Sequence, residues 1–257
     1  MSALLPDAPW HVLAAVPFVI LAGYIVFGAT GFGSSIISVP ALAHWFPLTF
    51  AVPLITALDC AATINASSRQ WRHADFGELR RIVPAMLIGI AVGTTVLFRL
   101  PRGPALLALG VFVMAYGIYS LVGGRREWKA ARSFWAWPVG VVGGMFSAVF
   151  GTGGPIYIVY LAARIHDKTA LRATMSLMIT ISVILRTTVF IVTGLLLQLP
   201  VVAAAIVLLP LMFIGYYLGN RAHHALSRTG VMKVIAVLLV VNGASLIVRA
   251  FAMWQSV

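Results

Sequence analysis

Charged side chains are scarce in this chain of 257 residues, where Asp, Glu, Lys and Arg together make up 9% and only 6 residues are acidic. Soluble domains carry roughly 25% charged residues, because charge keeps their surfaces hydrated. Hydrophobic residues make up 61% of the chain. They gather in runs that approach the roughly 20 residues needed to span the core of a bilayer. The sequence therefore predicts a polytopic integral membrane protein whose main partner is the lipid bilayer.

Residues and motifs for metal or nucleotide chemistry are also lacking. Cys60 is the single cysteine, which excludes a disulfide framework or a cysteine metal site. The six histidines are scattered, with no pair at metal-ligand spacing on one helix. Gly31-Phe-Gly-Ser-Ser lacks the lysine of a phosphate-binding loop, and Gly151-Thr-Gly-Gly lacks a serine nucleophile with a histidine base. We expect no cofactor, no metal and no enzymatic activity.

The excess of basic residues has a topological explanation. The chain has 18 Lys and Arg against 6 acidic residues. Short cytoplasmic loops of membrane proteins are rich in Lys and Arg, whereas nucleic-acid binding would need a basic surface interleaved with aromatics, which is missing. We therefore expect no nucleic-acid partner. Fourteen of the basic residues surround four loops: Arg69, Arg72, Arg80 and Arg81; Arg125, Arg126, Lys129 and Arg132; Arg164, Lys168 and Arg172; Arg221, Arg228 and Lys233.

The apolar segments are all predicted to be helices, full or half. Their connections are short, and strands of these lengths would be too few to close a barrel. The segments cover residues 10–28, 32–46, 48–67, 82–98, 104–122, 134–150, 155–163, 173–194, 200–219 and 231–253. We expect a single membrane domain over residues 1–257.

The two halves of the chain, residues 1–128 and 129–257, share one pattern and are predicted to be repeats. Each begins with a glycine-broken hairpin, and Gly89-xxx-Gly93 in the first half is matched by Gly215-xxx-Gly219 in the second. The offset between matching positions drifts only from 120 to 126 residues. Internal repeats of this kind are typical of secondary transporters.

Charge predicts how the two repeats are oriented. If each broken hairpin enters and leaves the membrane on the same side, all four basic clusters become cytoplasmic, and both chain termini lie on the extracytoplasmic side. Each half then crosses the membrane an odd number of times, so the repeats are inverted. The predicted fold is an all-α integral membrane protein with two inverted repeats. Each repeat is a broken re-entrant helical hairpin followed by three transmembrane helices.

The two breaks form the first candidate site. Backbone interrupted at membrane depth has to line a protein-walled or watery cavity, because unpaired N–H and C=O groups cost several kcal/mol in lipid. The helices that resume after the breaks present bare N–H groups, which bind anions. An alternative is that the glycines only allow close helix packing. The candidate substrate-binding residues of the breaks are Gly31, Phe32, Gly33, Ser34 and Ser35, and Gly151, Thr152, Gly153, Gly154 and Pro155.

Arg186 and Asp59 are the charged residues placed deepest in apolar segments. A central arginine is penalised by roughly 2.5–3.5 kcal/mol on insertion scales, so Arg186 should face a cavity or a partner. Its guanidinium offers a fork of donors that suits oxyanions. It either contacts a substrate anion or only pairs with Asp59, which is then its charge partner. Unpaired, Asp59 would instead be a proton carrier. Polar contacts to the cavity are expected from Asn65, Ser182 and Thr187.

Two stretches carry a resemblance to a known family. They are Gly28-Ala-Thr-Gly-Phe-Gly-Ser-Ser-Ile-Ile-Ser-Val-Pro-Ala-Leu42 and Gly151-Thr-Gly-Gly-Pro-Ile-Tyr-Ile. They resemble the TauE/SafE membrane permeases, also called the sulfite exporter or toluene-sulfonate uptake permease family. The serine pair Ser34-Ser35 replaces glycines that many relatives carry, so the tightness of that turn is in question.

The resemblance implies a secondary transporter of the bacterial inner membrane. Its substrates would be small sulfur or organosulfur anions such as sulfite, sulfonates or sulfoacetate. An ion gradient would drive their transport. Our own prediction is an exporter that works by alternating access around a midplane anion site. A passive anion channel with the same site, and a non-transport protein such as an insertase, are the alternatives. Export against import, the coupling ion (proton or sodium) and the oligomeric state, a homodimer included, stay open.

Overall fold

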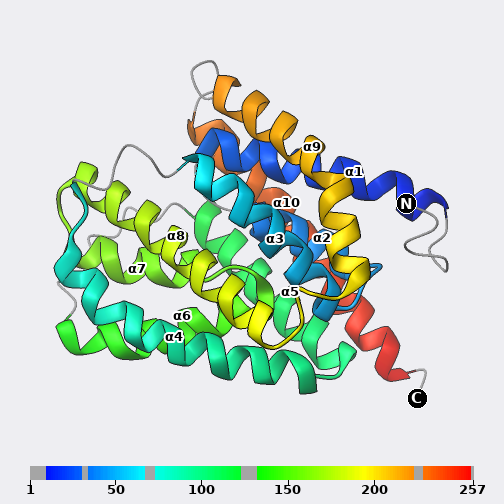
Figure 1. Cartoon of the computed structure of the whole chain (residues 1–257), viewed down its shortest axis with the longest axis horizontal. Coiled ribbons are helices and arrows are strands. Elements are labelled where there is room, and N and C mark those ends of the chain that lie inside the picture. Colours follow the sequence, from blue (N-terminus) through cyan, green and yellow to red (C-terminus); the bar gives the residue numbers. More distant parts are fainter. Residues whose placement is uncertain (1–9, 31–33, 67–72, 123–131, 223–227, 256–257) are drawn as a thin grey trace.

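The computed structural model describes residues 10–30, 34–66, 73–122, 132–222 and 228–255 (Figure 1). Within these ranges every regular element is helical. The helices are α1 (Trp10–Thr30), α2 (Ser34–Ala43), α3 (Leu48–Ala66), α4 (Phe76–Arg99), α5 (Arg102–Leu121), the short 3₁₀ helix η2 (Ser133–Trp135), α6 (Ala136–Phe150), α7 (Gly154–Arg164), α8 (Lys168–Val192), α9 (Leu199–Ala222) and α10 (Arg228–Gln255).

The predicted all-α fold is confirmed, and each predicted apolar segment corresponds to one helix. Two helices begin earlier than expected, α4 at Phe76 and α8 at Lys168. The reason is capping: the Asp75 carboxylate accepts hydrogen bonds from the backbone of Gly77 and Glu78, and that of Asp167 from Ala170. Such caps stabilise a polar first turn that apolar periodicity does not reveal.

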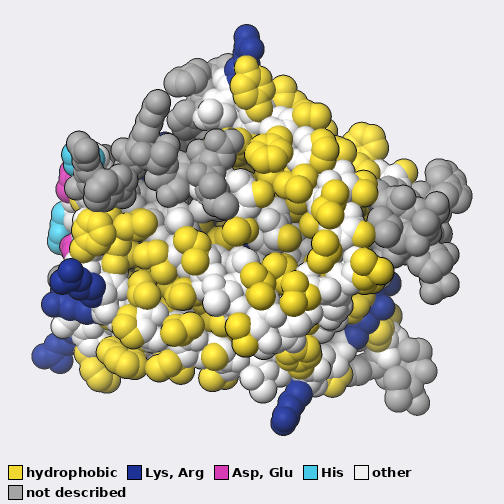
Figure 2. Space-filling view, in the orientation of Figure 1, with side chains coloured by type: hydrophobic (Ala, Val, Ile, Leu, Met, Phe, Trp, Pro, Cys, Tyr) yellow, Lys and Arg dark blue, Asp and Glu magenta, His cyan; other side chains and the backbone are white. Residues whose placement is uncertain are grey.

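Six helical stretches of the described chain are long and apolar enough to cross a membrane. They are Phe76–Arg99, Arg102–Leu121, Ser133–Phe150, Thr169–Val192, Leu199–Arg221 and Lys233–Met253. Apolar side chains dominate the face shown in Figure 2, and the Lys and Arg side chains lie at its margins. This distribution is the one expected of a protein that is solvated by lipid around its middle and by water at its ends.

Long helices pack in pairs. Helix α4 runs along α6, α1 along α9, and α5 along α10 (Figure 1). A Cβ atom at Gly93 of α4 would lie 2.7 Å from the carbonyl oxygen of Met145, and one at Gly219 of α9 only 2.0 Å from that of Ile25. These glycines therefore let the backbones of each pair touch.

The glycine contacts repeat between the two halves. Gly93 and Gly219 differ by 126 residues, and their partners Met145 and Ile25 by 120. Both offsets are those that the sequence shows between its halves. The packing of α1 on α9 therefore corresponds, at the repeat offset, to the packing of α6 on α4.

Helices α5 and α10 pack in opposite directions. Gly110 lies against Gly243, whereas Gly117, further along α5, lies against Ala236, which is earlier in α10. Gly117 and Gly243 are 126 residues apart, and so are Gly110 and Ala236. Exchanging the two halves of the chain therefore turns each of these two contacts into the other.

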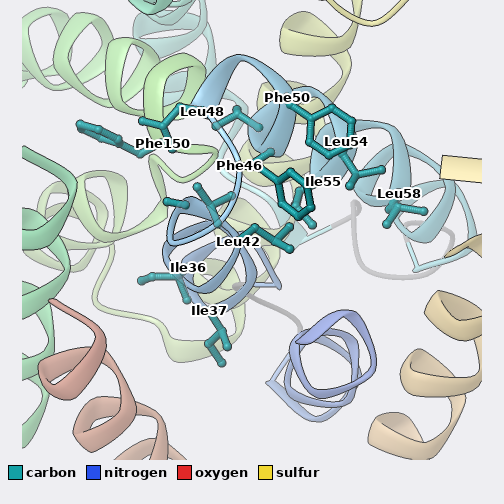
Figure 3. Close-up of a cluster of buried hydrophobic side chains, with 14 of the residues drawn as sticks. Ile36, Ile37, Leu42, Phe46, Leu48, Phe50, Leu54, Ile55, Leu58 and Phe150 are labelled. Atoms are coloured by element: carbon teal, nitrogen blue, oxygen red, sulfur yellow. The ribbon is translucent and has the colours of Figure 1, made fainter. Parts of the chain in front are cut away.

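Helices α2 and α3 lie inside the bundle. Nine of the ten residues of α2 are buried. Figure 3 shows the core around these helices, where Ile36 and Leu42 of α2, Leu54 of α3 and Phe150 of α6 gather. The short helix α2 packs against α1, which precedes it, just as α7 packs against α6. Each half therefore contains a helical hairpin with one short, enclosed arm.

Candidate functional site

The second hairpin breaks at a glycine turn. Helix α6 ends at Phe150, and Gly151 takes the left-handed conformation, with φ 77°. This conformation favours glycine because it has no Cβ. Helix α7 resumes at Gly154, with Pro155 in its first turn. A Cβ atom at Gly153 would lie 2.4 Å from the carbonyl oxygen of Gly143. The predicted interruption of this stretch is confirmed.

The first hairpin is interrupted at the matching place. Helix α1 ends at Thr30 and α2 begins at Ser34. Gly31, Phe32 and Gly33, which were predicted to contribute amides, lie outside the described residues. Ser34 and Ser35, in the first turn of α2, are buried.

The N-termini of α2 and α7 meet at one cavity of about 40 Å³. A Cβ atom at Gly151 would lie 3.2 Å from the Cβ of Ser35, so the two breaks are in close contact. A volume of this size holds roughly three water molecules. The cavity is lined by Phe27, Ser34, Ser35, Asp59, Thr63, Ser147, Gly151, Thr152, Gly153, Gly154, Tyr157, Ile179, Ser182, Val183 and Arg186.

Asp59 of α3 and Arg186 of α8 form an ion pair in the wall of this cavity. Arg186 Nη2 lies 3.3 Å from Asp59 Oδ2, and the side chains are only 1% and 6% exposed, respectively. The Asp59 carboxylate also accepts hydrogen bonds from the hydroxyls of Tyr24 (2.8 Å), Ser34 and Ser35 (2.7 Å). Asp59 is therefore held by four donors from α1, α2 and α8.

The other end of the Arg186 guanidinium contacts α6. Its Nη1 donates to the carbonyl oxygen of Ser147 at 2.9 Å, and the Ser147 and Ser182 hydroxyls share a hydrogen bond of 2.9 Å. Arg186 Nε has no hydrogen-bond partner in the described structure, and neither do the hydroxyls of Tyr157 and Thr63. Buried polar groups nearly always have a partner, so these groups leave hydrogen-bonding capacity for a ligand or water.

Most of the predicted site residues come together here. Ser34, Ser35, Gly151, Thr152, Gly153, Gly154, Ser182, Asp59 and Arg186 all line the cavity. Pro155 is in the first turn of α7 but is not part of the lining. Thr187 follows Arg186 on α8 with a buried hydroxyl, also outside the lining. The side chain of Asn65 lies outside the part of the structure that is described.

Sequence reasoning missed polar residues that line the cavity, Ser147 and Tyr157 among them, and Tyr24, which binds Asp59. Tyr24 and Ser147 lie within two helical turns before their breaks, and Tyr157 one turn after the second break. A search for polar side chains within two turns of each break would have found all three. Phe27 and Ser147 are 120 residues apart and both line the cavity, so the repeat offset offered a second signal.

A second buried carboxylate lies at the end of the molecule where α4 and α8 begin and α7 ends. Glu78 Oε1 accepts from Arg164 at 2.7 Å and from Arg81 at 3.0 Å, and Oε2 accepts from the Tyr160 hydroxyl at 2.8 Å. We call Glu78, Arg81, Arg164 and Tyr160 the Glu78 cluster. It joins the start of α4 to the end of α7.

Helices long enough to span a bilayer, packed around a buried ion pair and two broken hairpins, define a multi-pass membrane protein. The chain belongs to the sulfite exporter TauE/SafE family, whose model matches residues 15–246. It is similar to a protein described as "probable inner membrane transporter protein TsaS" from Comamonas testosteroni. The two are 26% identical over 197 residues, which cover 75% of this chain and 81% of the relative. No solved structure matched the chain.

Proposed function

We propose that this protein is a secondary transporter of the bacterial inner membrane that binds one small sulfur oxyanion, such as sulfite or a sulfonate, in the cavity between the two broken hairpins. This proposal rests on the hydrogen-bond donors of that cavity. Arg186 is the single cation among the described residues that line the cavity. Its Nε has no hydrogen-bond partner, and neither do the hydroxyls of the lining residues Tyr157 and Thr63. Membership of the sulfite exporter family supports a sulfur oxyanion as substrate, and the TsaS relative supports transport across the inner membrane.

The chemistry of the cavity suits an oxyanion. A guanidinium presents several donors in one plane, which match the oxygens of a sulfite or sulfonate group. Helix α7 points the positive end of its dipole at the cavity, because its first residue, Gly154, is part of the lining. Pro155 has no N–H, and the N–H groups of Ile156 and Tyr157 donate to the carbonyl oxygen of Gly153, so the first turn acts on an anion through its dipole. In this proposal the helix end and Arg186 hold opposite sides of the same headgroup.

Packing in the bundle supports inverted repeats. Helices α5 and α10 pack in opposite directions, and their glycine contacts map onto each other when the two halves are exchanged. A two-fold axis relating the halves would therefore run across these two helices. For helices that span a membrane, the axis then lies in the membrane plane. Inverted repeats around a central site are the usual basis of alternating access, in which one half rocks against the other.

The ends of the two short helices support hairpins that enter from opposite faces. The end of α7 is linked to the start of α4 through Arg164 and Glu78, and both helix ends carry basic residues that the sequence predicts to be cytoplasmic. The end of α2 is tied to α10 instead, where His44 Nε2 lies 2.9 Å from the Ser245 hydroxyl. We infer that the Glu78 cluster is cytoplasmic, and that both chain termini are extracytoplasmic.

A thermal-shift experiment in detergent tests the anion site. Sulfite or methanesulfonate should raise the melting temperature above that in chloride of equal ionic strength, because ligand binding stabilises the folded state. Arg186→Lys keeps the charge beside Asp59 but loses the fork, so most of the shift should disappear. Arg164→Lys, the matched change in the Glu78 cluster, should keep the full shift. An undiminished shift in Arg186→Lys would overturn the role of Arg186.

Flux in proteoliposomes separates a transporter from the channel alternative. With a proton gradient imposed, a transporter concentrates labelled sulfite against its own gradient, whereas a channel only equilibrates it. The insertase alternative predicts no sulfite flux in either condition.

A further inference from the structure

The Arg186 site already holds an anion, which is the carboxylate of Asp59. Its Oδ2 lies 3.3 Å from Arg186 Nη2, on the side of the guanidinium that faces α3. The cavity with the unpartnered groups adjoins the same two side chains. A substrate anion that uses the full fork of Arg186 therefore competes with Asp59 for the same positive charge.

The charges that line the cavity sum to zero. Asp59 and Arg186 are the only two charged side chains among the described lining residues. A monoanion that entered beside an ionised Asp59 would leave two negative charges and one positive charge in a buried cavity of about 40 Å³. Uncompensated charge in such surroundings costs several kcal/mol. Protonation of Asp59 removes the excess, because Arg186 keeps its own proton under all physiological conditions.

The other partners of Asp59 accept either of its protonation states. Tyr24, Ser34 and Ser35 contact it through hydroxyl groups. A hydroxyl both donates and accepts hydrogen bonds, so one of the three can rotate to accept from a protonated carboxyl group. The proton of neutral Asp59 then has a hydrogen-bond acceptor. A set of backbone N–H donors or a second cation would not offer this freedom.

The groups around Asp59 leave it as the proton acceptor of the site. From α1 it meets Tyr24, from α8 Arg186, and Tyr157 of α7 lies across the cavity. The neighbouring residues of α2 and α6 supply serine hydroxyls, and Tyr216 of α9 packs on the lining residue Phe27. Tyrosine is ordinarily neutral and arginine ordinarily charged in the physiological range.

We propose that Asp59 takes up one proton when one monovalent anion binds, so that transport is coupled to protons at a ratio of one to one. In the empty state Asp59 is ionised and pairs with Arg186. In the loaded state the proton comes from the compartment to which the site is open, Asp59 becomes a neutral acid, and the anion pairs with Arg186. The inference rests on the anion site proposed above, and it selects the proton over sodium as the coupling ion.

Calorimetry of the purified wild-type protein tests this directly. Methanesulfonate is a suitable probe because it stays a monoanion across the working range. Its binding heat, measured in buffers of different ionisation enthalpy, gives the protons taken up per anion, and the expected value is about one. Its affinity should fall about tenfold for each unit of pH in the range where Asp59 is ionised in the empty state. Binding without proton uptake and without pH dependence would overturn the inference while leaving the anion site intact.

Variants separate this inference from the function on which it rests. Asp59→Asn imitates the neutral acid, so it should bind methanesulfonate with pH-independent affinity and no proton uptake. In proteoliposomes it should exchange anion for anion but fail to accumulate it under a proton gradient. Asp167→Asn, on the exposed cap of α8, is the matched control and should behave as wild type. If Asp59→Asn still accumulates anion, the coupling role is wrong. If the wild type binds no methanesulfonate or sulfite at all, the proposed function fails first.

Discussion

Asp59 and Glu78 are buried carboxylates that each meet an arginine and a tyrosine hydroxyl, yet their surroundings differ. The arginines of the Glu78 cluster reach solvent, with Arg81 51% and Arg164 29% exposed, whereas Arg186 is 1% exposed. Every buried polar atom of the Glu78 cluster has a partner, but Arg186 Nε has none. The Glu78 cluster is a structural link between two helix ends in which all buried polar atoms are hydrogen-bonded. The Asp59 site is an ion pair beside a cavity, with donors left over for a ligand.

Removal of the arginine should give the largest difference in stability between the Asp59 and Glu78 pairs. Arg186→Gln leaves the Asp59 charge buried without its cation and should cost about 3–5 kcal/mol. Arg164→Gln leaves Glu78 with Arg81, Tyr160 and solvent, and should cost about 1 kcal/mol. Unfolding temperatures in detergent provide the comparison. The double variant Arg186→Gln with Asp59→Asn should regain part of the loss. Equal losses in the two single variants would contradict the distinction.

Removal of the tyrosine hydroxyl gives a smaller and more selective effect. Tyr24→Phe and Tyr160→Phe each delete one donor that lies 2.8 Å from a carboxylate oxygen. Hydrogen bonds to charged groups contribute about 1.5–3 kcal/mol, so both variants should melt earlier. Methanesulfonate affinity at neutral pH should change only in Tyr24→Phe. There it should tighten several-fold, because ionised Asp59 has lost a donor and takes up its proton more readily. A similar change in Tyr160→Phe would link the Glu78 cluster to the anion site.

Arg81→Ala should have the smallest effect. Its guanidinium is half exposed and lies 3.0 Å from Glu78 Oε1 on the same helix. Exposed pairs contribute about 0.2–1 kcal/mol, and salt screens them. The difference in melting temperature from wild type should therefore shrink as salt is added. A difference that persists in high salt would show that Arg81 acts through packing instead.

The sequence predicted the helices and the meeting of the two breaks because both depend on local chemistry. Apolar runs and Gly or Pro interruptions locate the helices, and bare backbone in a membrane needs an enclosed cavity. The pairing of Asp59 with Arg186 was predicted as one of two alternatives, since opposite charges at membrane depth neutralise each other.

The remaining site residues depend on how each helix is rotated about its axis. Tyr24 and Tyr157 lie in apolar runs, and nothing local shows whether a tyrosine there faces lipid, core or cavity. The Glu78 cluster was missed for a related reason, because Arg164 and Glu78 are 86 residues apart and only the fold brings them together. Caps at Asp75 and Asp167 were local signals that apolar periodicity alone does not capture.

The balanced charges of the cavity bear on the energy source of the transporter. A membrane potential does work of about 2.3 kcal/mol per 100 mV on each elementary charge that crosses. In the proposed exchange the empty site carries Asp59 and Arg186, and the loaded site carries a proton and a monoanion in addition, so its sum is zero in both states. Voltage then favours neither direction. A cell that has lost its electrical potential but kept its difference in acidity would still move the anion.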